Sequence, residues 1–245
     1  MKRRRPAELG PPDAARAELD GLIVNVELTL ISVISGTSLY FLIDSARGPL
    51  VGLEYARWPY LVTGLLFALT FWARAILHSL TVIKWPIEFG HNFLYIGVTA
   101  LQSILFTQVG ALPRWYAVGV SYAAMIWVLF VFDQRMLRQR LAESVTAAGR
   151  ELYDILSREQ RANIVLFAPA MIALFVAAAV CLARWPGFFL ERGGHLLFAG
   201  VALVSAVVYL HQVARFYLEI SPRILAARRA EGHREPRAPG DENTG

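Results

Sequence analysis

The sequence predicts an all-α, polytopic membrane protein with six transmembrane helices, because its hydrophobic residues are concentrated in six long runs. Hydrophobic residues make up 56% of the chain and charged residues only 18%, too little polar cover for a water-soluble domain. Each run has roughly 18–26 residues, which is enough to cross a hydrocarbon core of about 30 Å. The six expected spans are residues 22–43, 58–83, 93–112, 115–132, 164–182 and 195–220.

The distribution of basic residues predicts that both termini lie in the cytoplasm. With that orientation only five Lys or Arg residues fall in outside loops, namely Arg47, Arg57, Arg114, Arg184 and Arg192. Apart from Arg74 and Arg215, which lie within spans, all the others fall in inside segments, as the positive-inside rule requires. The net charge of +5 is therefore a topology signal, and no nucleic-acid partner is expected. We expect the protein in the plasma (bacterial inner) membrane, with the lipid bilayer as its surroundings.

Three segments follow from these spans. Residues 1–21 form an N-terminal cytoplasmic arm, residues 22–220 the transmembrane domain, and residues 221–245 a largely disordered cytoplasmic tail with little to bury. Between spans four and five, residues 133–163 carry apolar residues at spacings of three and four, which predicts an amphipathic cytoplasmic helical segment. This segment forms either a helical hairpin near Gly149 or a helix on the membrane surface. It acts as a solvated linker or as a binding site for a cytoplasmic protein partner.

Charged residues inside the spans are the best indication of function, because charge in hydrocarbon is costly and usually functional. Span two carries Arg74 and His78, and span six carries His211 and Arg215, each pair at a spacing of four. Both spans run from outside to inside, so the two pairs are expected at similar depth in the cytoplasmic half.

Polar residues on the other spans extend this set to a predicted polar cavity that opens to the cytoplasm. Glu27, on span one, is the expected countercharge for Arg74 or Arg215. The predicted lining residues are Asn25, Glu27, Arg74, His78, Gln102, His211 and Arg215. Alternatively, these residues form a buried network that only holds the helices together, since each such contact contributes about 0.6–2 kcal/mol.

The favoured function is a channel or transporter for an ion or small solute through this cavity. A homo-oligomer is expected, because the polar interior of one 245-residue subunit makes a narrow pore. One alternative is a membrane electron-transfer subunit in which His78 and His211 ligate a b-type haem. Another is a membrane scaffold or accessory subunit without catalysis.

Enzymatic activity is left open, with non-enzymatic function favoured, because the sequence has no HExxH or GxSxG motif. His78, Glu88 and His91 are the only residues that resemble a metal-binding set, and they surround the second inside loop. A polar loop in contact with lipid headgroups is the alternative interpretation of these three residues.

Overall fold

The computed structural model describes residues 12–83 and 89–232, and every element in these ranges is helical. Residues 1–11 of the predicted arm (1–21), Glu88 and residues 233–245 of the predicted tail (221–245) lie outside the described residues. Short helical turns lie beside the long helices: η1 (Tyr55–Arg57), the π-helical η2 (Asn163–Phe167) and η3 (Gly187–Glu191). The seven long helices are α1 (Pro12–Val51), α2 (Trp58–Thr81), α3 (Phe89–Thr107), α4 (Leu112–Glu143), α5 (Ala147–Ala162), α6 (Ala168–Arg184) and α7 (His195–Gly232).

Five helical segments are long and apolar enough to cross a membrane: Glu18–Val51, Tyr55–Thr81, Leu112–Glu143, Ala147–Arg184 and His195–Ala230. They contain the expected spans one, four, five and six and all but the last two residues of span two, so the structure supports an integral, multi-pass membrane protein. The expected third span forms α3 but is not in this set. Polar residues such as Asn92, Gln102 and Ser103 lower its hydropathy.

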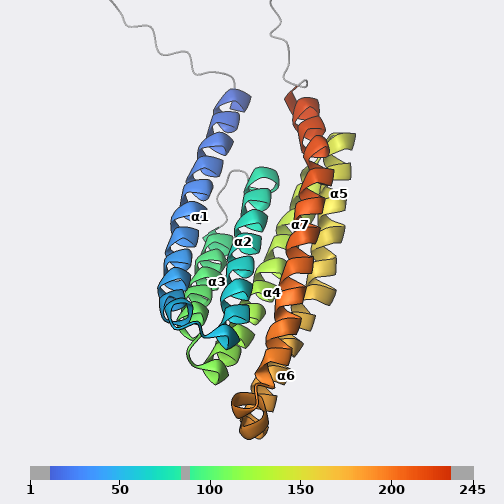
Figure 1. Ribbon diagram of the computed structural model, residues 1–245. Coiled ribbons are helices and arrows are strands. Elements are labelled where there is room, and N and C mark those ends of the chain that lie inside the picture. Colours follow the sequence, from blue (N-terminus) through green and yellow to red (C-terminus); the bar gives the residue numbers. More distant parts are fainter. Residues whose placement is uncertain (1–11, 84–88, 233–245) are drawn as a thin grey trace, which may run out of the picture.

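The helices form a closed ring. Helix α1 packs against α2 and α3, α3 against α4, and α4 against α5 and α6, while α7 completes the ring by packing against α2, α5 and α6. The described ends of α1 and α7 lie at the same end of the bundle as the turn between α4 and α5 (Figure 1). An even number of membrane crossings would likewise place the two described ends of the chain on the same side.

Residues 133–163 form a helical hairpin, one of the two arrangements expected from the sequence. Its first arm is a direct continuation of α4 to Glu143, and its second arm is α5. The turn precedes Gly149, whose backbone N–H donates to the Thr146 hydroxyl at 3.0 Å. This bond satisfies one of the free N–H groups at the start of α5. Leu152 and Leu156 are buried in the same cluster as residues of α4 and α7.

Helix α5 continues into α6 through the π-helical turn η2, which ends two residues before Pro169. Proline lacks a backbone N–H and disturbs a regular helix on its N-terminal side. A wider π turn at this point keeps the helix continuous.

Helices α4 and α6 approach each other closely at Gly119. A Cβ atom at this position would lie 2.8 Å from Cδ1 of Phe175, whose side chain is 1% exposed. The glycine therefore permits a helix contact that a larger residue would prevent.

We predict that Gly119→Ala destabilises the protein by about 1–3 kcal/mol, because the added Cβ would push the buried Phe175 ring and α6 away from their present packing. The measurement is the thermal unfolding temperature in detergent. Gly200→Ala is the matched control, since nothing lies within 4 Å of the added Cβ there. An unfolding temperature for Gly119→Ala that equals or exceeds that of Gly200→Ala would contradict the close packing of α4 and α6.

Candidate functional site

A cavity of about 100 Å³ lies inside the ring of helices, lined by residues of all seven long helices. Aromatic and aliphatic side chains form most of its wall, including Phe67, Phe71, Tyr122, Met171 and Phe175. The ionisable and amide side chains that line it are Arg74, His78, His91, Asp133, Glu159 and Gln160.

Arg74 pairs with a glutamate of α5. Its Nη1 donates to Oε1 of Glu159 at 2.7 Å and its Nη2 to Oε2 at 3.3 Å. Nη2 also donates to Oε1 of Gln160 at 2.7 Å, and the guanidinium carbon lies 5.0 Å from the centre of the Phe130 ring. The positive charge of Arg74 is thus balanced by a two-pronged ion pair between α2 and α5.

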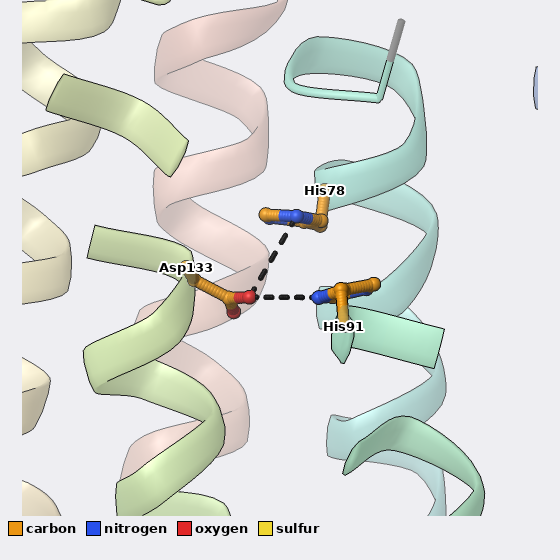
Figure 2. A group of neighbouring side chains, drawn as sticks. All are labelled: His78, His91 and Asp133. Atoms are coloured by element: carbon orange, nitrogen blue, oxygen red, sulfur yellow. Dashed lines mark hydrogen bonds and ion pairs between the residues drawn. The ribbon is translucent and has the colours of Figure 1, made fainter. Parts of the chain in front are cut away.

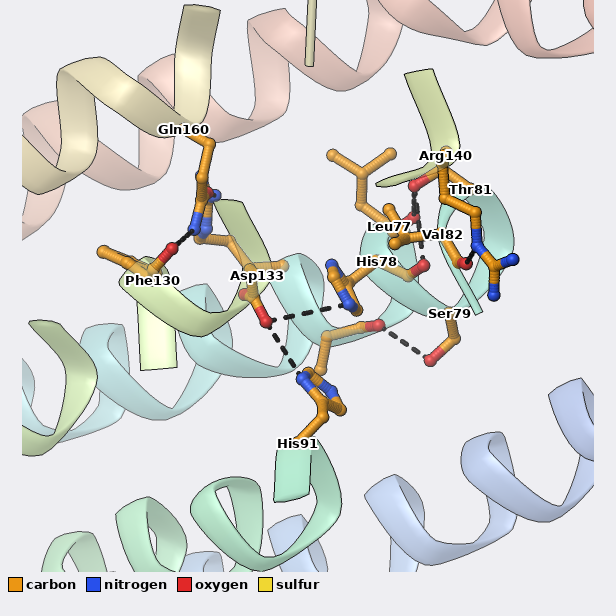
Figure 3. A network of polar contacts seen from close by, with 12 residues as sticks. Leu77, His78, Ser79, Thr81, Val82, His91, Phe130, Asp133, Arg140 and Gln160 are labelled. Atoms are coloured by element: carbon orange, nitrogen blue, oxygen red, sulfur yellow. Dashed lines mark hydrogen bonds and ion pairs between the residues drawn. The ribbon is translucent and has the colours of Figure 1, made fainter. Parts of the chain in front are cut away.

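The Arg74–Glu159 pair is part of a longer chain of hydrogen bonds. Nδ2 of Asn163 donates to Oε1 of Glu159 at 2.7 Å, and the Tyr209 hydroxyl donates to Oδ1 of Asn163 at 3.1 Å. Gln160 donates in turn to the backbone oxygen of Phe130 at 3.0 Å (Figure 3). These contacts connect α2, α4, α5 and α7 around the cavity.

His78, His91 and Asp133 meet from three different helices, α2, α3 and α4. The two imidazole rings are stacked with centroids 4.6 Å apart and an interplanar angle of 19°. Oδ1 of Asp133 lies 2.9 Å from Nδ1 of His91 and 3.7 Å from Nε2 of His78. Figure 2 shows one nitrogen of each histidine beside the Asp133 carboxylate. Nε2 of His78 is buried and has no hydrogen-bond partner among the described residues.

The structure does not bring the two Arg–His pairs together. Arg74 and His78 line the cavity, whereas His211 and Arg215 are exposed on the outer face of α7. The inward face of α7 instead carries Tyr209 and Val213. His211 follows Tyr209 by two residues and so points to the opposite side of the helix. The expectation that His211 and Arg215 face the cavity is corrected accordingly.

The other three predicted lining residues do not line the cavity either. Gln102 is buried and satisfied, because it accepts from Ser38 at 3.1 Å and donates to Tyr122 at 3.0 Å. Glu27 is buried on α1, but the carboxylate that balances Arg74 belongs to Glu159. Asn25 is exposed. The expected Glu27–Arg74 pair is therefore wrong, and Gln102 instead connects α1, α3 and α4.

The proposed haem site does not fit this geometry. His78 lies in the cavity while His211 is exposed on the outside of the bundle, so they do not face a common site. The cavity of about 100 Å³ is also much smaller than the roughly 300–1,000 Å³ pockets that hold drug-sized ligands.

Four charged, histidine or amide residues of the cavity were missing from the predicted lining: His91, Asp133, Glu159 and Gln160. His91 appeared in the sequence only as a member of a possible metal set, and the structure pairs it with Asp133. Asp133, Glu159 and Gln160 belong to the segment that we assigned to the cytoplasm. The available signal was the uninterrupted helical pattern from span four into this segment.

No family model, curated protein or solved structure matches the chain.

We predict an energetic coupling between Arg74 and Glu159 but none between Arg74 and Glu27. In a double-mutant cycle with Arg74→Met and Glu159→Gln, unfolding in detergent should give a coupling of about 1–3 kcal/mol. This range lies below the ~3–5 kcal/mol cost of breaking a fully buried pair, because the two side chains remain 16% and 23% exposed.

The matched cycle replaces Glu159→Gln by Glu27→Gln. Its coupling with Arg74→Met should be within about 0.5 kcal/mol of zero, as for independent sites. A larger coupling to Glu27 than to Glu159 would restore the pairing that the sequence suggested.

Proposed function

We propose that this protein spans the membrane six times, with both termini in the cytoplasm, and passes an ion or small solute through its central cavity. The observation that carries this proposal is the convergence of ionisable side chains from four helices on one cavity within an apolar bundle. Arg74 and His78 come from α2, His91 from α3, Asp133 from α4 and Glu159 from α5. Such groups are expensive to hold in hydrocarbon and are typically retained for function.

The alternative of a purely structural network is less well supported. A network that only locks helices together is expected to satisfy all of its buried polar groups. Gln102 fits that description, with both ends of its amide bonded. By contrast, the buried Nε2 of His78 lacks a hydrogen-bond partner among the described residues, which favours a site that receives something from outside the chain.

The sixth crossing in this proposal is α3. It packs against α1 and α4, and its axis runs alongside those of the helices that are long and apolar enough to cross a membrane (Figure 1). The bias of Lys and Arg toward one set of connections supports a cytoplasmic position for the end of the bundle where the described chain begins and ends.

Side-chain contacts at the end of the bundle opposite the described chain ends support a cavity that opens to one side at a time. There the Tyr60 hydroxyl lies 3.1 Å from that of Tyr116 and 2.8 Å from Nδ1 of His195. Trp115 packs on Tyr60 with its side chain 1% exposed. A permeating species would need this aromatic layer to rearrange, as in a gated pathway.

The balance of charge in the cavity favours a cation over an anion. Arg74 is neutralised by Glu159, and the described contacts of the Asp133 carboxylate are with the two histidines. With neutral imidazoles, the lining carries one net negative charge. An unpaired arginine in the lining would favour anions, and the pairing of Arg74 with Glu159 removes that preference.

Two partner proposals accompany this function. A homo-oligomer remains a proposal, based on the narrowness of a pathway through one subunit. A cytoplasmic protein partner at residues 133–163 would contact the polar side of α5, which exposes Glu151 and Asp154, because the apolar side packs against this chain itself.

We predict that Asp133→Asn reduces cation flux into liposomes containing the purified protein by about tenfold or more, since removing the carboxylate removes the net negative charge of the cavity. The measurement is uptake of a cation into vesicles against a chemical gradient. Asp154→Asn is the matched control, because Asp154 is exposed on α5 and pairs only with Arg158 among the described residues. Equal flux in wild type, Asp133→Asn and protein-free vesicles would refute a permeation pathway.

A further inference from the structure

Histidine nitrogens and a carboxylate oxygen converge at one point of the cavity wall. The candidate ligand atoms of His78, His91 and Asp133 all lie within 4.8 Å of one another. We propose that these three residues bind one divalent transition-metal ion of the Zn²⁺ or Fe²⁺ type. This inference rests on the proposed passage of a cation and names the class of cation.

The distances fit a shared ion with small adjustments. Two ligand atoms that each lie about 2.1 Å from one ion are separated by roughly 3–4 Å. The Asp133 oxygen lies 2.9 Å from the His91 nitrogen and 3.7 Å from the His78 nitrogen. The third separation, between the two histidines, needs to shorten by about 1 Å or less, which rotation of the imidazole rings provides.

The ligand types select the class of metal. Two imidazoles and one carboxylate suit Zn²⁺ and Fe²⁺, whereas Mg²⁺ and Ca²⁺ prefer oxygen ligands alone. The single cysteine, Cys181, does not line the cavity, so the thiolate that favours Cu⁺ is missing from this site.

The surroundings supply both charge and space for an ion. The hydrogen-bond and ion-pair contacts of Asp133 among the described residues are with His91 and His78. Arg74 also attracts this carboxylate electrostatically, but it forms its ion pair with Glu159, so a bound cation would further stabilise the buried charge of Asp133. The pairing of Arg74 with Glu159 limits repulsion between the guanidinium and the ion. A cavity of about 100 Å³ accommodates an ion with a few waters, since each water occupies about 30 Å³.

Three protein ligands leave at least one coordination position open. Closed sites with four protein ligands are typical of structural zinc, whereas sites with three ligands exchange a water or a substrate. A permeating ion needs such an incomplete site, because conduction requires binding that is weak enough for release.

The test is metal binding by the purified full-length protein in detergent, after treatment with a chelator. Titration with Co²⁺ alone should produce visible absorption bands of a nitrogen- and oxygen-ligated ion, saturating at one ion per chain. Zn²⁺ should displace the Co²⁺ and abolish the bands. His78→Ala, His91→Ala and Asp133→Asn should each weaken binding by more than about 100-fold, beyond the 10–100-fold typical of losing an outer-shell partner.

His211→Ala is the matched control, because this histidine is exposed on the outer face of α7 and should leave the affinity unchanged. The Co²⁺ titration of the wild type requires no substitution, so it remains decisive if a variant fails to fold. Absence of the bands in the wild type, or equal loss of binding in His211→Ala and His78→Ala, would overturn the proposal.

Metal binding and flux can be separated. Wild-type protein that passes cations but binds no metal at this site overturns the metal site and leaves the proposed passage intact. Stoichiometric binding that depends on His78, His91 and Asp133, without flux, supports the metal site and overturns the passage.

Discussion

The ion pair between Arg74 and Glu159 is the interaction on which the arrangement of the cavity depends. A guanidinium within a bundle of apolar helices needs a nearby carboxylate, since an unpaired buried charge is strongly destabilising. Glu159 reaches Arg74 because the chain folds back after α4 and places α5 against α4 and α7. Its further contact with Asn163, and through it with Tyr209, connects this pair to α7. The pair thus determines both where α5 lies and how the cavity is charged.

The membrane-crossing helices could be predicted from hydropathy, because lipid requires long apolar segments with internally satisfied backbones. Which side of a helix faces inward was harder to predict. Spans two and six carry Arg–His pairs with the same spacing, yet only Arg74 and His78 face the cavity. Spacing places residues on a common face but does not orient that face. On α7 the signal was the row of small buried residues Ala199, Ala202 and Ala206, which allows close helix packing.

The partners of the intramembrane charges could not be predicted for a different reason. Asp133 and Glu159 lie at opposite ends of a segment that hydropathy assigned to the cytoplasm. The helical pattern that runs on from span four could have indicated that this segment extends the bundle, but the pairing of these carboxylates results from tertiary contacts among α2, α3, α4 and α5. The metal-like set around the second inside loop was partly informative, since His78 and His91 are indeed adjacent. The third member is supplied by α4, which follows α3 in the chain and packs against it.

The π-helical turn η2 also affects the wall of the cavity. Each π hydrogen bond spans one residue more than an α-helical bond, so the turn offsets the rotational phase of α5 from that of α6. Along this nearly continuous rod, α6 presents Met171 and Phe175 to the cavity while α5 presents Glu159 and Gln160. A further residue inserted into the turn, if it continued as regular helix, would rotate the two segments relative to each other by about 100° and turn the carboxylate away from the guanidinium. Changes in chain length should therefore be tolerated far less within η2 than in the exposed connections at either end of the bundle.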